Sequence, residues 1–158
     1  MKKRVYGLLA AALCAVVLAG CAAEQESAAP YTKEQVQALL DEGVFSETLE
    51  ELDCDVAWAL YGLEEQGVSR DQLIDGMIFR SAGATCEEAA LLILEGEEAA
   101  ESTFTAVEQY LEGQVESNRD YRPAEIPKLE SAYLERRGET VLLVVAPDSA
   151  AVKEILEK

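Results

Sequence analysis

The first 30 residues limit the fold most, because their pattern removes them from any folded domain. Residues 2–4 are all basic, residues 5–17 form an apolar stretch, and the sequence Leu-Ala-Gly-Cys follows at residues 18–21. This order is typical of a bacterial signal peptide and its cleavage site. The apolar stretch is too short to span the roughly 30 Å hydrocarbon core of a bilayer comfortably as a permanent helix. We therefore predict a signal peptide over residues 1–20.

The cleavage site resembles the lipobox of bacterial lipoproteins, in which small residues precede a cysteine. The resemblance implies that Cys21 receives diacylglycerol and then palmitate, since a thiolate is the best nucleophile available and two acyl chains give stable anchoring. The alternatives are ordinary secretory cleavage or an uncleaved anchor. We expect an extracytoplasmic protein held at the cell membrane, with a flexible tether over residues 21–30 and one folded domain over residues 31–158.

The charge of the chain limits its partners. The formal net charge is -18, and removal of residues 1–20 takes away three cations and no acid, which leaves the mature chain near -21. Such a surface repels nucleic acids and anionic lipid headgroups, so we expect neither as a ligand. It suits cationic partners or divalent ions, or it is a solvated surface that keeps the domain off the membrane.

Two of the four cysteines remain after the signal peptide and the lipid site are set aside. They are Cys54 and Cys86, because Cys14 lies in the apolar stretch and Cys21 carries lipid. A disulfide between them would close a 33-residue loop and contribute about 3–4 kcal/mol in the chain-entropy model. The alternative, which we favour, is two free thiols that pack as small apolar groups.

Apolar periodicity and capping residues predict an α+β domain. Thr32 and Gln35 have capping-box spacing, and Asp53 and Asp148 are suited to N-cap further helices. The expected helices cover about residues 32–43, 53–62, 97–117 and 148–156, and the expected strands cover about residues 76–80, 89–94, 131–136 and 140–145.

The order after the first two helices is therefore β-β-α-β-β-α. Two hairpins joined by a helix suggest a four-stranded, mainly antiparallel sheet with helices packed on one face. The strand over residues 140–145 contains consecutive apolar residues and is expected to be central. Residues 118–127, which include Pro123 and Pro127, are expected to form a loop.

Four groups of short segments form a series: Tyr61-Gly62-Leu63, Ser81 to Thr85 with Glu87-Glu88, Tyr121 and Pro123 with Lys128-Leu129, and Gly138 leading into Val141 to Val145. Together they resemble an uncharacterised family of small lipoproteins from Gram-positive bacteria, a domain of unknown function. The resemblance covers about residues 45–157, and it implies an α+β fold and a surface tether but no activity. Cys54 and Cys86 are not part of the pattern.

No residue pattern predicts catalysis, a metal site or a cofactor. The chain has no histidine, which excludes Ser-His-Asp and Cys-His centres and removes the commonest zinc ligand. Acidic residues crowd residues 50–55 and 95–98, but neither segment has the spacing of a calcium loop. Solvated surface acids are the better interpretation, and Glu51 with Asp53 is the carboxylate pair that a hydrolase hypothesis would test.

The turn between the first two strands holds the candidate ligand contacts. Arg80 ends an apolar strand beside Ser81, and Thr85 closes the turn. Arg80 either holds an anionic ligand or pairs with Asp75 or Glu88 across the hairpin, and we favour the pairing.

We expect a non-catalytic binding or scaffolding module of the cell envelope, tethered to the membrane. Its partner would be an envelope protein, a peptide or a wall component. The alternatives are a carboxylate-based hydrolase that acts on an envelope component, and a carrier of a small ligand or cation.

Overall fold

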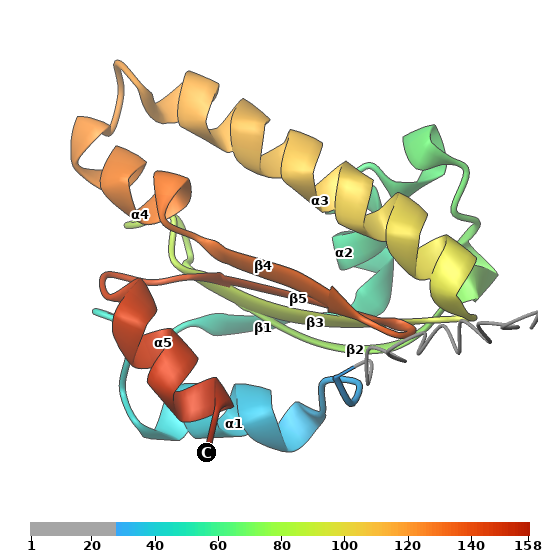
Figure 1. Cartoon of the computed structure of the whole chain (residues 1–158). Helices are drawn as coiled ribbons and strands as arrows, with labels where there is room; N and C mark the ends of the chain where they lie inside the picture. The colour runs from blue at the N-terminus through green and yellow to red at the C-terminus, as the bar shows by residue number, and fades with distance from the viewer. Residues whose placement is uncertain (1–27) are drawn as a thin grey trace, which may run out of the picture.

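A five-stranded antiparallel sheet forms the centre of the protein (Figure 1). The computed structural model describes residues 28–158. The strand order is β1-β2-β3-β5-β4. The α+β class is confirmed, whereas the predicted four-stranded sheet lacked the edge strand β1. The strands are β1 Glu50–Leu52, β2 Leu73–Arg80, β3 Glu88–Leu94, β4 Tyr133–Arg137 and β5 Thr140–Val145.

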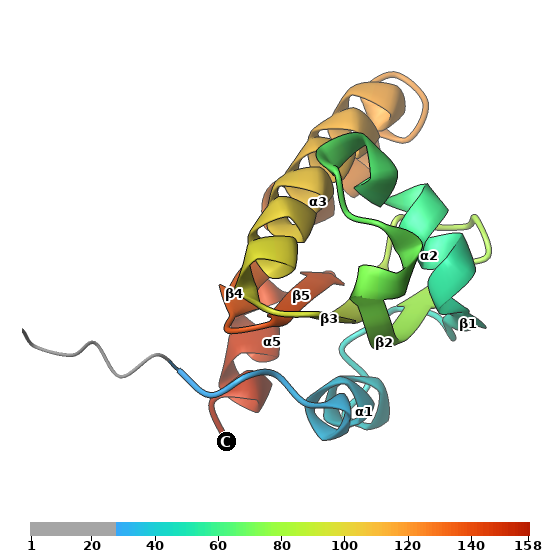
Figure 2. The same cartoon turned by 90° about the vertical axis from the view of Figure 1, so that its right-hand side faces the viewer.

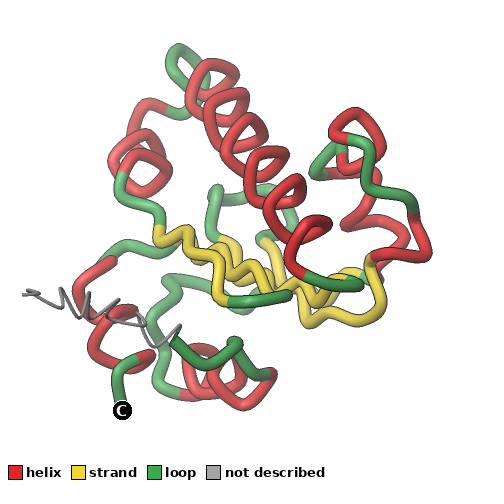
Figure 3. Tube along the Cα trace, turned by 45° about the vertical axis from the view of Figure 1, so that its right-hand side comes forward, coloured by secondary structure: helices red, strands yellow, loops and turns green. Residues whose placement is uncertain are grey.

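Helices cover both faces of this sheet, so the prediction of helices on one face was wrong (Figures 1 and 2). The first and last helices pack against one face and the other three against the opposite face, which gives three layers (Figure 3). The α-helices are α1 Lys33–Asp41, α2 Cys54–Leu60, α3 Glu97–Asn118, α4 Ile126–Glu130 and α5 Ser149–Leu156. Short 3-10 turns cover Leu63–Gln66, Arg70–Gln72 and Pro123–Glu125.

The two central strands explain why both faces need cover. In β3, Ala90 and Leu92 join the apolar cluster under α2 and α3, whereas Ala89 and Leu91 join the cluster over α1 and α5. All six residues of β5 are buried as well. A strand that is apolar on both sides must be covered on both sides, since exposed apolar surface is unfavourable in water.

The predicted helix starts are confirmed by their hydrogen bonds. The Thr32 backbone N–H donates to Gln35 Oε1 over 3.0 Å, as a capping box requires. Asp53 Oδ1 accepts from Val56 N over 2.9 Å, and Asp148 Oδ1 accepts from two backbone N–H groups of α5. The predicted loop before β4 instead contains a 3-10 turn and α4, because proline is compatible with the first turn of a helix.

The N-terminal segment joins the domain through Tyr31, beside the β4–β5 turn. The Tyr31 backbone N–H donates to Thr140 Oγ1 over 2.9 Å, and the Tyr31 hydroxyl lies 2.6 Å from that of Tyr133 and 2.7 Å from Glu135 Oε2. The Arg137 guanidinium stacks over the Tyr31 ring, 4.2 Å from its centroid. Among residues 28–158, Tyr31 is therefore the first that belongs to the core.

No helix among residues 28–158 is long and apolar enough to cross a membrane. Both apolar clusters are built from residues between Tyr31 and Leu156. We therefore expect a shortened chain that begins at Ser27 to unfold in one cooperative transition by calorimetry. A broad transition, with dye-binding apolar surface before it, would show instead that the domain needs the preceding residues.

Candidate functional site

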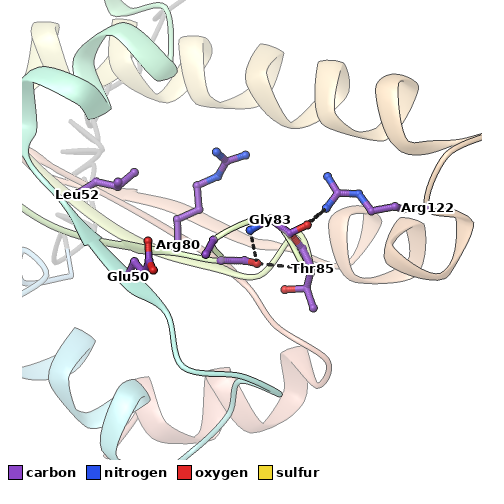
Figure 4. Close-up of a pocket in the computed structure, with 8 residues that line it drawn as sticks. Glu50, Leu52, Arg80, Gly83, Thr85 and Arg122 are labelled. Atoms are coloured by element: carbon purple, nitrogen blue, oxygen red, sulfur yellow. Dashed lines mark hydrogen bonds between the residues drawn. The ribbon is translucent and has the colours of Figure 1, made fainter.

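The three predicted contact residues meet in a pocket of about 270 Å³ at the end of the β2–β3 hairpin (Figure 4). The pocket lies beside β1 and below the chain that follows α3. Arg80 comes from the end of β2, and Ser81 and Thr85 come from the connection to β3. The lining residues are Glu50, Leu52, Arg80, Ser81, Ala82, Gly83, Thr85 and Arg122.

The two hydroxyl groups hold the shape of the connection. Ser81 Oγ accepts hydrogen bonds from Gly83 N over 3.1 Å and from Thr85 N over 3.0 Å. Thr85 Oγ1 donates to Glu47 Oε1 over 2.6 Å, and hydrogen bonds from Thr85 and Ser81 lower the pKa of Glu47. These hydroxyls therefore position the loop, and the positive charge at the pocket comes from arginine.

Arg80 pairs with Glu88, one of its two predicted partners. The two residues lie opposite each other in the hairpin register, and Arg80 Nε is 3.7 Å from Glu88 Oε2. Asp75 pairs instead with Lys33 over 2.7 Å. The Arg80 side chain keeps 31% of its surface exposed, and a guanidinium carries five N–H donors, more than this one pair can occupy. Arg80 therefore has donors left for the pocket.

Glu88 is a buried carboxyl group that lies beside Arg80 in the hairpin. It is 1% exposed, and the hydroxyls of Tyr61 and Tyr110 donate to its two oxygens. Burial raises the pKa of Glu88 and also raises the pKa of both tyrosines, which therefore remain hydrogen-bond donors. The two rings meet edge to face with centroids 5.0 Å apart. Arg80 thus lies against a packed polar cluster of Glu88, Tyr61 and Tyr110.

Arg122 is the pocket residue that the sequence analysis missed. Its Nε donates to Asn118 Oδ1 over 2.7 Å, and its Nη1 donates to the carbonyl oxygens of Gly83 and Thr85 over 3.1 and 3.2 Å. Within the described part of the chain, its Nη2 has no hydrogen-bond partner and its charge has no ion pair. Figure 4 shows the guanidinium groups of Arg80 and Arg122 on the same side of the hairpin.

A second polar network holds the start of β3 to α4. Lys128 Nζ lies 2.8 Å from Glu87 Oε1 and 3.0 Å from Glu125 Oε1, and Glu87 has no exposed surface. Ser46 donates to Glu87 through both its backbone N–H and its hydroxyl. Glu125 Oε2 also accepts from Cys86 N over 2.8 Å. These contacts therefore hold the start of β3 to α4 and to the segment around Ser46.

Cys54 and Cys86 are free thiols in the structure. Cys54 Sγ lies beside Gly76 in β2, whereas Cys86 is buried at the hairpin end. Burial raises the pKa of both thiols, so both are poor nucleophiles. Cys14, Cys21 and the predicted cleavage site lie outside the described residues.

The acidic segments do not form a site among residues 28–158. Glu51 is exposed, and the Asp53 carboxylate is occupied as the N-cap of α2. Within that range, no group of three or more acidic or cysteine side chains is arranged to hold a metal ion.

The comparisons with known proteins identify a family but no activity. No curated protein and no solved structure matches the chain. A family model described as Domain of unknown function (DUF4358) matches residues 46–146, which include the hairpin, both arginines of the pocket and Lys128. This match covers more than half of the sequence, and the chain therefore belongs to the DUF4358 family.

Proposed function

We propose that this protein is a lipoprotein of the cell envelope, tethered through Cys21 outside the cytoplasmic membrane, and that its domain is a non-catalytic binding module. The sequence of residues 1–21 supports the tether, as basic, apolar and small residues precede the cysteine in the order that lipid attachment requires. The binding role is supported by the arginine pair at the hairpin, where hydrogen-bond donors remain free.

The observation that carries this proposal is the position of the pocket relative to the tether. The N-terminal segment meets the domain at Thr140, which lies opposite Ile93 in the register of β3 and β5. The pocket lies beyond Glu88, at the other end of β3. Five residue steps at about 3.4 Å separate the two ends. A tether from Cys21 would therefore enter the domain at the end of β3 opposite the pocket, and it would leave the pocket open to a ligand.

The hydrolase alternative has weaker support. Such an enzyme needs two carboxyl groups about 5–10 Å apart in a cleft, one of them free to transfer a proton. The acidic residue that lines this pocket is Glu50, whereas Glu88 is buried and accepts hydrogen bonds from two tyrosine hydroxyls. The free groups are guanidinium donors, which favour recognition of an anion over proton transfer.

Labelling with palmitate tests the tether. Cells that produce the wild-type chain should incorporate labelled palmitate into the protein, and cells that produce Cys21→Ser should not, because serine lacks the thiol that forms the thioether. Cys54→Ser serves as the matched control, since it removes a thiol from the folded domain and should leave labelling intact. Equal labelling of the wild type and Cys21→Ser would refute the lipid site.

A further inference from the structure

We propose that the pocket between Arg80 and Arg122 binds the carboxylate group of a small ligand. This inference rests on the proposed binding role and names the chemistry of its ligand. The two guanidinium groups come from chain segments about 40 residues apart, yet both border one pocket of about 270 Å³. A carboxylate can accept from two such donors at once, which gives short and directional hydrogen bonds.

Both arginines are held in place before any ligand arrives. Arg80 is paired with the buried Glu88 over 3.7 Å, and Arg122 is held by hydrogen bonds to Asn118 and to two carbonyl groups of the loop. These contacts leave Nη2 of Arg122 free among the described residues, together with N–H donors of Arg80. Since little side-chain freedom is lost on binding, an anion held there gains more of the interaction energy.

The charges around the pocket favour a single negative charge over a double one. Glu50 lines the pocket, and Glu88 lies beside Arg80, so two carboxyl groups oppose the two guanidinium groups. The described domain also carries 29 acidic and 10 basic residues, which repel a dianion more strongly than a monoanion. A carboxylate therefore suits the pocket better than a phosphate does.

The other residues that line the pocket indicate what the rest of the ligand looks like. Leu52 and Ala82 give the pocket an apolar side, and its volume admits several atoms besides the carboxylate. A short peptide with a free carboxyl terminus and a small organic acid both have this chemistry, and the choice of probe separates them.

The test uses the chain that begins at Ser27, which contains both apolar clusters and the whole pocket. Calorimetric titrations compare N-acetyl-glycylglycine with its C-terminal amide, with acetate and with inorganic phosphate. We expect the free acid to bind at least about tenfold more tightly than the amide, and more tightly than phosphate. Tighter binding of the dipeptide than of acetate assigns a peptide terminus, and equal binding assigns a small organic acid. Binding of the amide as tight as that of the acid, tighter binding of phosphate, or no binding of either carboxylate would overturn the proposal.

Three variants locate the site. Arg80→Gln and Arg122→Gln should each weaken binding of the acid by about tenfold or more, because each removes a charged donor. Arg136→Gln makes the same change of charge at the exposed residue of β4, whose side chain bonds only to Gly138 O among the described residues, and it should leave binding unchanged. An equal loss in all three variants would indicate a general charge effect and would overturn the assignment.

A fourth variant guards against the chance that an arginine replacement disturbs the loop. Glu50→Gln removes an opposing charge from the pocket rim, and it should tighten carboxylate binding severalfold. Misfolding cannot produce tighter binding, so unchanged or weaker binding counts against the proposal.

The palmitate experiment does not involve the pocket. Failure of the titrations with intact labelling of Cys21 would therefore refute the ligand class and leave the tether standing.

Discussion

Replacement of Lys128 with alanine is expected to lower the free energy of unfolding by about 3–5 kcal/mol, because it leaves a buried charge without its partner. Glu87 has no exposed surface, and Lys128 supplies its cation over 2.8 Å. Glu125 loses the same cation, although it keeps the hydrogen bond from Cys86 N. Chemical denaturation of the wild type and the variant at neutral pH measures the difference.

Lys153→Ala is the matched control for this prediction. Lys153 lies exposed on α5, and within the described residues it forms no ion pair, so its loss should change the free energy of unfolding by no more than about 0.5 kcal/mol. Glu87→Gln combined with Lys128→Ala should be more stable than Lys128→Ala alone, since the buried charge is then absent. Equal losses of unfolding free energy in Lys128→Ala and Lys153→Ala would show that the buried pair stabilises the fold no more than an exposed lysine does.

The same pair predicts how stability depends on pH. Burial by itself raises the pKa of Glu87, but the hydrogen bonds from Lys128 and Ser46 outweigh burial and lower the pKa below its ordinary value. A lowered folded-state pKa stabilises the protein above the pKa of the unfolded chain, and that contribution is lost as pH falls through the folded-state pKa. The stability difference between the wild type and Lys128→Ala should therefore shrink from pH 7 to about pH 3.

Leu142→Ala should lower the free energy of unfolding by about 2–5 kcal/mol through the cavity that it leaves. Leu142 has no exposed surface, lies opposite Leu91 in the two central strands, and packs in the cluster covered by α1 and α5. The sequence analysis predicted helices on only one face of the sheet, and Leu142 lies in the cluster on the second face. The variant therefore also tests the three-layer arrangement.

The control for the cavity is Ile74→Ala. Ile74 lies in β2 with 60% of its surface exposed, so truncation removes few contacts and should cost less than about 1 kcal/mol. Denaturation curves for both variants give the comparison. A loss for Leu142→Ala as small as that for Ile74→Ala would mean that the face covered by α1 and α5 is not tightly packed.

Local signals in the sequence identified most helices and strands, because capping and apolar periodicity act between neighbouring residues. Asp53 and Asp148 each cap the predicted helix, and β5 is central as expected. β1 escaped prediction because two of its three residues are glutamates, and it is a strand only through its register with β2. The second helical layer could have been inferred from β3 and β5, since both are apolar at consecutive positions and not only at alternate ones.

The sequence predicted only part of the candidate site, because its signals act between residues that are close along the chain. Arg80, Ser81 and Thr85 are close in sequence, and the hairpin register also explains the pairing of Arg80 with Glu88. Arg122 follows α3, and the length and direction of that helix decide where it lies. No local pattern around Arg122 encodes that path, so only the folded structure brings it to the pocket.

The attachment of Tyr31 determines how the domain responds to mechanical force. A pull on the N-terminal segment reaches Tyr31 before it reaches α1, and there it acts against the hydrogen bonds to Thr140, Tyr133 and Glu135. These partners belong to the β4–β5 hairpin, so the load passes into paired strands instead of peeling α1 from the sheet. A pull on the N-terminal segment would thus load the β4–β5 hairpin first, and the residues that line the pocket take no part in the Tyr31 contacts.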